Sequence, residues 1–158
     1  MNPIAEQMDV PPGYPKPSQL MSWDLVTEKL TAARTYWLAS MRPDGRPHVV
    51  PRDGTWIGGA LYYGGSAETV HARNVGAAAP VTMHIGDGIE AIIVEGTATI
   101  EKPTPTQARE LADASFAKYP QYGRMDPTMY EGGVLVLRPV RVLAWTDFGL
   151  DATRFRFL

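Results

Sequence analysis

Cysteine is absent from the 158 residues of this chain. Its absence excludes disulfide bonds, thiolate nucleophiles and metal sites with cysteine ligands, and it suits a reducing compartment. Long hydrophobic runs are absent as well, since no segment approaches the ~20 apolar residues that a membrane-spanning helix requires. The first residues also lack the basic stretch followed by an apolar core that marks a signal peptide. We therefore expect a cytoplasmic protein without a membrane partner.

An excess of charge of one sign is also missing. The chain has 15 Lys and Arg residues against 17 Asp and Glu residues, which gives a formal net charge of −2. This balance provides no basic field of the kind that attracts nucleic acid, so we expect no nucleic-acid partner. The three histidines, His48, His71 and His84, do not have the spacing of a metal motif. We expect no metal site.

Motifs for nucleotide binding and nucleophilic catalysis are missing too. The chain has no Gly-x-x-x-x-Gly-Lys-Ser/Thr loop and no Gly-x-Ser-x-Gly elbow. Gly86-x-Gly88-x-x-Ala91 formally matches a dinucleotide fingerprint, but it precedes a strand pattern and not a helix, so it indicates a hairpin turn. Hydrolase chemistry is unsupported, and the sequence identifies no catalytic residue.

Proline is concentrated in the first 20 residues, at positions 3, 11, 12, 15 and 17. Prolines at this density oppose a regular helix or a central strand. We expect residues 1–20 to form a proline-rich arm that is a disordered tail, the alternative being an arm that wraps a partner subunit or covers a pocket. Residues 21–158 are long enough for one domain with a sizeable core.

Short apolar runs between turn residues predict a mainly β fold. Asp44-Gly45 between two such runs is a hairpin signal, and Gly96 in the middle of a run indicates a bulge or a close backbone approach. We expect six or seven antiparallel strands in a split β-barrel, because closure removes exposed edges. The predicted strands are residues 35–41, 47–52, 60–63, 80–85, 91–100, 134–138 and 140–145, with a break at Pro139 and a possible final strand at 154–157.

Three helices are predicted from capping residues and apolar spacing. Ser22 can cap a helix to about Ala33, and Thr104 with Gln107 forms a capping box that opens a second helix. The third is a short helix at residues 69–77, and it carries Thr69, His71, Arg73 and Asn74. Hydroxyl, guanidinium and amide groups beside free backbone N–H groups can bind a phosphate.

These segments resemble those of the pyridoxamine 5'-phosphate oxidase-like, FMN-binding split barrels, and most of all the flavin/deazaflavin branch that includes enzymes using coenzyme F420. The similarity runs from about Trp23 to Trp145. The residues that carry it are Trp37-Leu38-Ala39-Ser40, Asp44-Gly45-Arg46-Pro47-His48, Pro51, Gly54-Thr55-Trp56, the segment Thr69 to Val75, Pro80 and Glu95-Gly96-Thr97-Ala98.

The resemblance implies a homodimer with a flavin-type cofactor at the subunit interface, and hydride transfer between the cofactor and a small organic substrate. Thr69, His71, Arg73 and Asn74 would hold the phosphate, although His71 stands where the family usually has lysine. The implied ring-side contacts are His48, Val49, Val50, Pro51 and Arg52. Trp56 would also contact the cofactor, and Trp56 or Trp145 would line the substrate side.

F420 is slightly favoured over FMN, because the Thr-x-His-x-Arg-Asn segment looks more like the deazaflavin branch. The chain also lacks the extended C-terminal substrate-binding region of true pyridoxamine phosphate oxidases, so we do not expect that specific activity. Two alternatives stay open. One is a non-catalytic split barrel that carries a cofactor or a haem, and the other is an interaction domain that binds no ligand.

Overall fold

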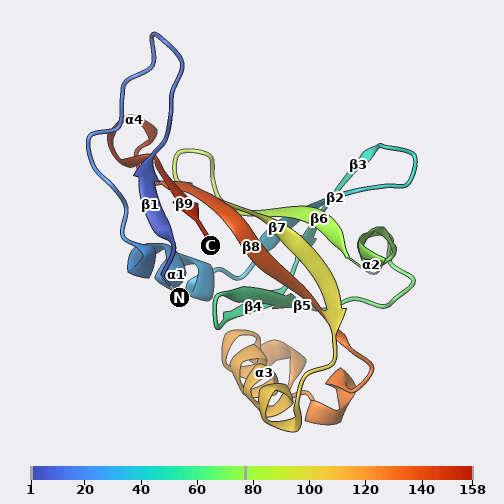
Figure 1. The fold of residues 1–158 in the computed structure, drawn as a ribbon. Helices are drawn as coiled ribbons and strands as arrows, with labels where there is room; N and C mark the ends of the chain where they lie inside the picture. Colours follow the sequence, from blue (N-terminus) through green and yellow to red (C-terminus); the bar gives the residue numbers. More distant parts are fainter. Residues whose placement is uncertain (1, 77, 158) are drawn as a thin grey trace.

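A computed structural model of the protein describes residues 2–76 and 78–157. Within these residues the backbone forms one antiparallel sheet of nine strands (Figure 1). The strand order is β1-β9-β8-β7-β6-β2-β3, and β5 joins β4 to β8. The strands are β1 (Ile4–Gln7), β2 (Tyr36–Met41), β3 (Pro47–Arg52), β4 (Gly54–Ile57), β5 (Ala60–Tyr63), β6 (Ala79–Gly86), β7 (Ala91–Glu101), β8 (Val134–Trp145) and β9 (Thr153–Arg156).

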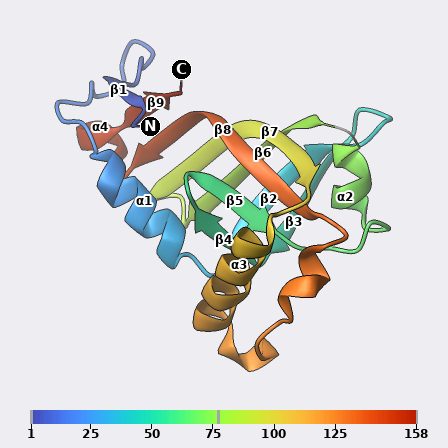
Figure 2. The ribbon, with the colours of Figure 1, turned by 60° about the horizontal axis from the view of Figure 1, so that its bottom comes forward.

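The helices lie around the sheet (Figures 1 and 2). α2 is at the β2–β3 end, whereas α4 is at the opposite end beside β1 and β9. The helices are α1 (Trp23–Ala32), α2 (Val70–Val75), α3 (Pro105–Lys118), α4 (Phe148–Asp151) and the short 3₁₀ helices η1 (Pro120–Tyr122) and η2 (Pro127–Tyr130). No helix in the described part of the chain is long and apolar enough to cross a bilayer.

The predicted fold class, a mainly β antiparallel split barrel, is confirmed, but the number of strands is higher than expected. β4 and β1 were not predicted as strands, while the possible final strand is present as β9. The predicted break at Pro139 is wrong, because β8 continues through this residue. The register of the β7–β8 pairing shifts between Glu95 and Gly96, and Gly96 lies opposite Pro139. This bulge accommodates Pro139, which cannot donate a ladder hydrogen bond.

Gly96 is needed at this bulge. A Cβ atom at this position would lie 2.0 Å from the carbonyl oxygen of Arg138, so the predicted close backbone approach is confirmed.

The N-terminal arm is anchored, which differs from the disordered tail expected from its prolines. Ile4–Gln7 pairs with β9, and Glu6 forms ion pairs with Arg154 and Arg156. None of these four strand residues is a proline, and β1 is an edge strand that needs backbone partners on one side only. Further along the arm, the backbone N–H of Ser18 donates to Leu150 of α4 at 2.9 Å.

The main core combines the inner face of the sheet with residues of α1 and α2, and a smaller cluster joins Leu111 of α3 to β5 and β8. Val26 and Leu30 of α1 are fully buried, and Ser22 caps this helix by accepting a hydrogen bond from the N–H of Leu25. The capping box of α3 is also confirmed: the N–H of Gln107 donates to Thr104 Oγ1, and the N–H of Thr104 donates to Gln107 Oε1.

The C-terminal end of α3 is tied to the sheet by Lys118. Its ammonium donates to the carbonyl oxygens of Ala33 and Gly54 and to the hydroxyl of Tyr36, at 2.9, 3.1 and 2.9 Å. Burial lowers the pKa of Lys118 to about 8, and the nearby charge of Arg34 lowers it further in the same direction. This contact holds α3 against β4, and thereby fixes one wall of the candidate site.

Candidate functional site

The edge strand β3 carries most of the residues that the resemblance assigned to a cofactor ring. Within the described residues β3 pairs only with β2, so the backbone groups along its other edge are available to a ligand. The alternation of the strand divides the side chains between two faces. His48, Val50 and Arg52 lie opposite the buried residues of β2, whereas Val49 and Pro51 lie on the outer face opposite Ala39 and Trp37.

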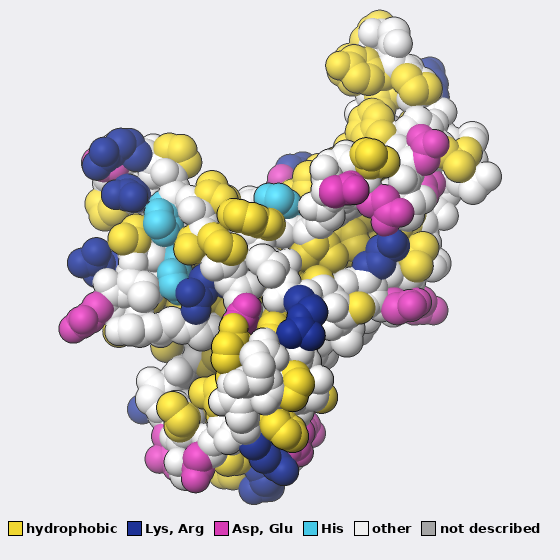
Figure 3. All heavy atoms as spheres, turned by 180° about the vertical axis from the view of Figure 1, so that it is seen from behind, with side chains coloured by type: hydrophobic (Ala, Val, Ile, Leu, Met, Phe, Trp, Pro, Cys, Tyr) yellow, Lys and Arg dark blue, Asp and Glu magenta, His cyan; other side chains and the backbone are white. Residues whose placement is uncertain are grey.

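The outer face of β2 and β3 exposes large hydrophobic side chains. Trp37, Met41 and Val49 retain 42%, 56% and 56% of their accessible surface, and the indole of Trp37 stacks on the ring of His84. Figure 3 shows hydrophobic side chains and histidines close together on the side opposite to that of Figure 1. A monomer seldom leaves such a group of apolar side chains exposed without a function for it.

The four residues predicted to bind phosphate do not all point the same way. Arg73 is exposed and lines a hollow of about 460 Å³ between α2 and the β2–β3 turn, together with Arg42, Asp44 and Asn74. The amide of Asn74 donates to Ser40 Oγ at 2.9 Å, which fixes α2 on β2. Thr69 precedes α2, and its hydroxyl donates to the carbonyl oxygen of Ser66 at 2.8 Å.

His71 points inward, away from this hollow, and only 3% of its surface is exposed. Its Nε2 atom lies 3.4 Å from both the carbonyl oxygen of Gly64 and the hydroxyl of Thr69. Burial lowers the pKa of His71, and the charges of Arg52 and His48 act in the same direction. The imidazole is therefore neutral near pH 7, and Arg73 and Arg42 supply the positive charge at the hollow.

Arg42 was missed as a site residue because its position in the Arg42-Pro43-Asp44-Gly45 turn suggested only a structural role. The turn itself forms as predicted, with Gly45 at a φ of 82°. The carboxylate of Asp44 pairs with Arg46, which lowers the pKa of this carboxyl group and leaves Arg42 without an ion pair among the described residues.

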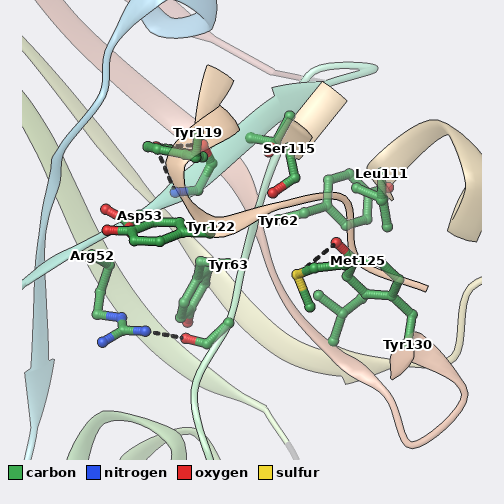
Figure 4. A pocket seen from close by; sticks show the side chains of 14 residues that line it. Arg52, Asp53, Tyr62, Tyr63, Leu111, Ser115, Tyr119, Tyr122, Met125 and Tyr130 are labelled. Carbon is green, nitrogen blue, oxygen red and sulfur yellow. Dashed lines mark hydrogen bonds between the residues drawn. The ribbon is translucent and has the colours of Figure 1, made fainter. Parts of the chain in front are cut away.

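A second cavity, of about 180 Å³, lies at the other end of β3 (Figure 4). Residues from β3 to β5 form one side of it, and α3 with the segment that follows forms the other. Five of the seven tyrosines of the chain line this cavity. They are Tyr62, Tyr63, Tyr119, Tyr122 and Tyr130. We call this cavity the tyrosine pocket.

The tyrosine pocket could not be found from a motif, because its residues come from three separate segments. The signal available in the sequence was the closeness of Tyr119 and Tyr122, which are three residues apart. In the structure the ring centroids of these two residues are 6.0 Å apart, in a stacked arrangement, and the hydroxyl of Tyr119 lies within hydrogen-bond distance of the carbonyl oxygens of Arg34 and Gly54.

Arg52 connects the tyrosine pocket to the α2 end of the sheet. It lines the pocket, and its Nη2 atom donates to the carbonyl oxygen of Gly64 at 2.9 Å. The same oxygen lies next to His71, and the ring of His71 is 6.2 Å from that of Tyr63. A hollow with two arginines therefore lies near the start of β3, and Arg52 lines an aromatic pocket at its end.

Neither tryptophan proposed as a substrate wall lies in these two cavities. Trp56 is 3% exposed and belongs to the hydrophobic core. Trp145 lines a different hollow, with α1 and the turn between β6 and β7, and packs edge-on against Phe148. The described residues contain no group of three or more acidic or histidine side chains that could hold a metal ion.

Comparison with known proteins relates this chain to others by fold. No family model matches it, and no protein of curated function matches its sequence. A conserved hypothetical protein from Mycobacterium tuberculosis has a TM-score of 0.65 and 21% identity, over 82% of this chain and 87% of that one. An F420 reductase has a TM-score of 0.51 and 24% identity, over 84% and 98% of the two chains.

A heme binding protein from Mycobacterium smegmatis has a TM-score of 0.61 and 18% identity, over 84% of this chain and 58% of that one. At such identities these likenesses show the fold alone. Proteins of this fold thus include one named as a heme binding protein and one named as an F420 reductase.

Proposed function

We propose that this protein is an oxidoreductase that binds a flavin-type cofactor along β3 and transfers hydride between this cofactor and a small organic substrate. The observation that carries the proposal is the arrangement of the two cavities. A hollow with two arginines lies near the start of an edge strand, and an aromatic pocket with a third arginine lies at its end. Six strand residues span about 17 Å, which suits an extended cofactor with a phosphate at one end.

The residues at the hollow fit a phosphate group. Arg73 and Arg42 supply guanidinium donors that form no ion pair with a carboxylate of the described residues, although Asp44 also lines the hollow, and Asn74 keeps α2 in place. His48, Val50 and Arg52 would face the ring from one side of β3. His71 would support the Gly64 loop and would not itself contact the phosphate, so Arg73 and Arg42 would carry the phosphate binding.

A flavin-type ring supplies the hydride chemistry, while the protein supplies position, electrostatics and exclusion of water. The substrate would enter the tyrosine pocket, where Arg52 lies next to the ring-binding part of β3. This division of labour explains why the sequence shows no acid–base pair.

We further propose that the protein is a homodimer whose subunits meet through the outer face of β2 and β3. Burial of Trp37, Met41 and Val49 at this contact would remove their apolar surface from water.

Fluorescence titration with F420 and, separately, with FMN tests the proposal. We expect F420 to bind more tightly, in line with the Thr-x-His-x-Arg-Asn segment, and we expect reduced F420 to be oxidised by conjugated substrates. Tight binding of FMN alone would reassign the cofactor. Binding of neither cofactor would overturn the proposed function.

A second candidate is a split barrel that binds a cofactor or heme without turnover. The neutral, buried His71 in the place of a lysine favours it, because it reduces the charge available for a phosphate. Binding of hemin or F420 without any hydride exchange in the presence of reduced cofactor would support this candidate against the first.

A further inference from the structure

The tyrosine pocket contains two buried hydrogen-bond donors that have no acceptor. The hydroxyl of Tyr63 and the Nε atom of Arg52 are both buried, and neither has a hydrogen-bond partner among residues 2–76 and 78–157. Tyr63 as a whole is only 2% exposed. A buried donor without an acceptor destabilises the folded protein, so native proteins rarely retain one without a reason.

These two donors belong to the same end of the pocket. Arg52 bonds to the carbonyl oxygen of Gly64, the residue that follows Tyr63, and the charge of Arg52 acts to lower the pKa of the Tyr63 hydroxyl, which burial raises. Figure 4 shows Arg52 and Tyr63 beside Tyr122, with Met125 and Tyr130 toward the opposite end. An acceptor that entered from the pocket could therefore be met by both donors.

The charge at this end is positive. Arg52 forms no ion pair with any described residue, and Asp53, which also lines the pocket, is exposed. The guanidinium therefore favours a ligand atom that carries negative charge, and charge-assisted bonds of this kind are stronger than neutral ones.

The rest of the lining sets the shape of the ligand. Phenol rings and the side chains of Leu111 and Met125 form flat and apolar walls. A cavity of about 180 Å³ is below the ~300 Å³ at which pockets for drug-sized ligands begin, so it suits a single ring better than a fused ring system such as a flavin.

We propose that the tyrosine pocket binds a small aromatic carboxylate, with its ring among the tyrosines and its carboxylate on the Tyr63 hydroxyl and Arg52 Nε. This inference deepens the proposed function by naming a substrate class, and it rests on that function only in treating the ligand as a substrate. Binding itself requires no cofactor.

Calorimetric titration of the purified protein with benzoate and with its neutral analogue benzamide tests this proposal. We expect benzoate to bind at least about tenfold more tightly than benzamide, because only benzoate carries a charge for Arg52. Absence of benzoate binding, or equal affinity for the two probes, would overturn the inference.

Two substitutions at the donors sharpen the test. Tyr63→Phe removes only the unpartnered hydroxyl and should weaken benzoate binding about tenfold, while the melting temperature stays the same or rises. Arg52→Gln should reduce the preference for benzoate over benzamide to below about twofold, and this second variant keeps the test decisive if Tyr63→Phe does not fold.

Tyr14→Phe is the matched control outside the pocket. Tyr14 is 59% exposed and does not line the pocket, so removal of its hydroxyl should change benzoate affinity less than about twofold. A Tyr63→Phe variant that binds benzoate as the unaltered protein does would exclude the assigned contact.

Separate titrations with F420 and FMN keep the two proposals distinguishable. Binding of a cofactor without benzoate would overturn only the ligand assignment. Binding of benzoate without either cofactor would overturn only the proposed oxidoreductase function.

Discussion

The two ends of β3 hold positive charge in opposite ways. At the α2 end, Arg73 is exposed on a short helix and faces an open hollow. At the other end, Arg52 is partly buried, is bonded to the backbone of Gly64 and lies within an aromatic pocket. Solvent and salt screen the first charge but affect the second much less. The exposed end is therefore suited to a strongly charged group such as phosphate, and the enclosed end to discrimination between similar small molecules.

The difference extends to the neighbouring side chains. His71, on the same helix as Arg73, is buried and neutral, whereas Lys118, beside the tyrosine pocket, is half-buried and fully hydrogen-bonded. Membership of a helix thus does not determine whether a titratable side chain is buried and hydrogen-bonded. The direction in which the side chain leaves the backbone determines this.

The largest effect is expected for His71→Lys, which restores the residue usual in the resembling family. The inward direction of this side chain would bury an ammonium group near Arg52, so we expect a loss of about 3 kcal/mol in the free energy of unfolding. Urea denaturation measures it. Arg73→Lys on the exposed side of the same helix is the control and should lower the free energy of unfolding by less than about 0.5 kcal/mol. A His71→Lys variant of unchanged stability would show that this side chain can turn outward.

Lys118→Ala should have the next largest effect, now at the tyrosine-pocket end. It removes three hydrogen bonds that join α3 to the sheet, and we expect a loss of about 2 kcal/mol in stability. Affinity for a phosphate-bearing cofactor should change little, because the hollow at α2 is not touched. Lys102→Ala, at an exposed position, provides the comparison, and similar stabilities of the two variants would contradict the structural role of Lys118.

Arg73→Ala tests the exposed end by itself. Loss of a charge-assisted hydrogen bond should weaken cofactor binding by roughly 1.5–3 kcal/mol without a change in stability. Fluorescence titration at two salt concentrations measures the affinity for the cofactor and how strongly salt weakens it. Arg109→Ala, on the surface of α3, should leave the affinity unaltered. Equal affinities of the Arg73 variant and the unaltered protein would remove the phosphate assignment.

The smallest effect concerns pH. The pKa of Lys118 is lowered to about 8 in the folded protein, so between pH 8 and about 10 the unfolded chain binds a proton that the folded chain has released. Stability should therefore rise over this range, by about 1 kcal/mol, since Lys118 is only half-buried and solvent screens part of the shift. Urea midpoints measured from pH 8 to 10 should show the rise, and Lys118→Met should abolish it.

Sequence alone determined the structural features that depend on residues close together in the chain. The hairpin at Asp44-Gly45, the Ser22 cap and the Thr104–Gln107 capping box all formed as predicted, because each depends on local backbone geometry and short-range hydrogen bonds. The alternation of apolar residues likewise determined the antiparallel β class. Gly96 indicated its bulge because only a residue without Cβ fits beside the carbonyl of Arg138.

Only the tertiary structure decided the features that depend on residues far apart in the chain. Pairing of Ile4–Gln7 with the C-terminal strand β9 ordered an arm whose prolines suggested disorder. The burial of His71 depends on how α2 packs over the Gly64 loop, and the tyrosine pocket depends on α3 and its following segment reaching β3 to β5. Local pattern cannot specify such contacts, because burial and side-chain direction are set by the packing of whole elements.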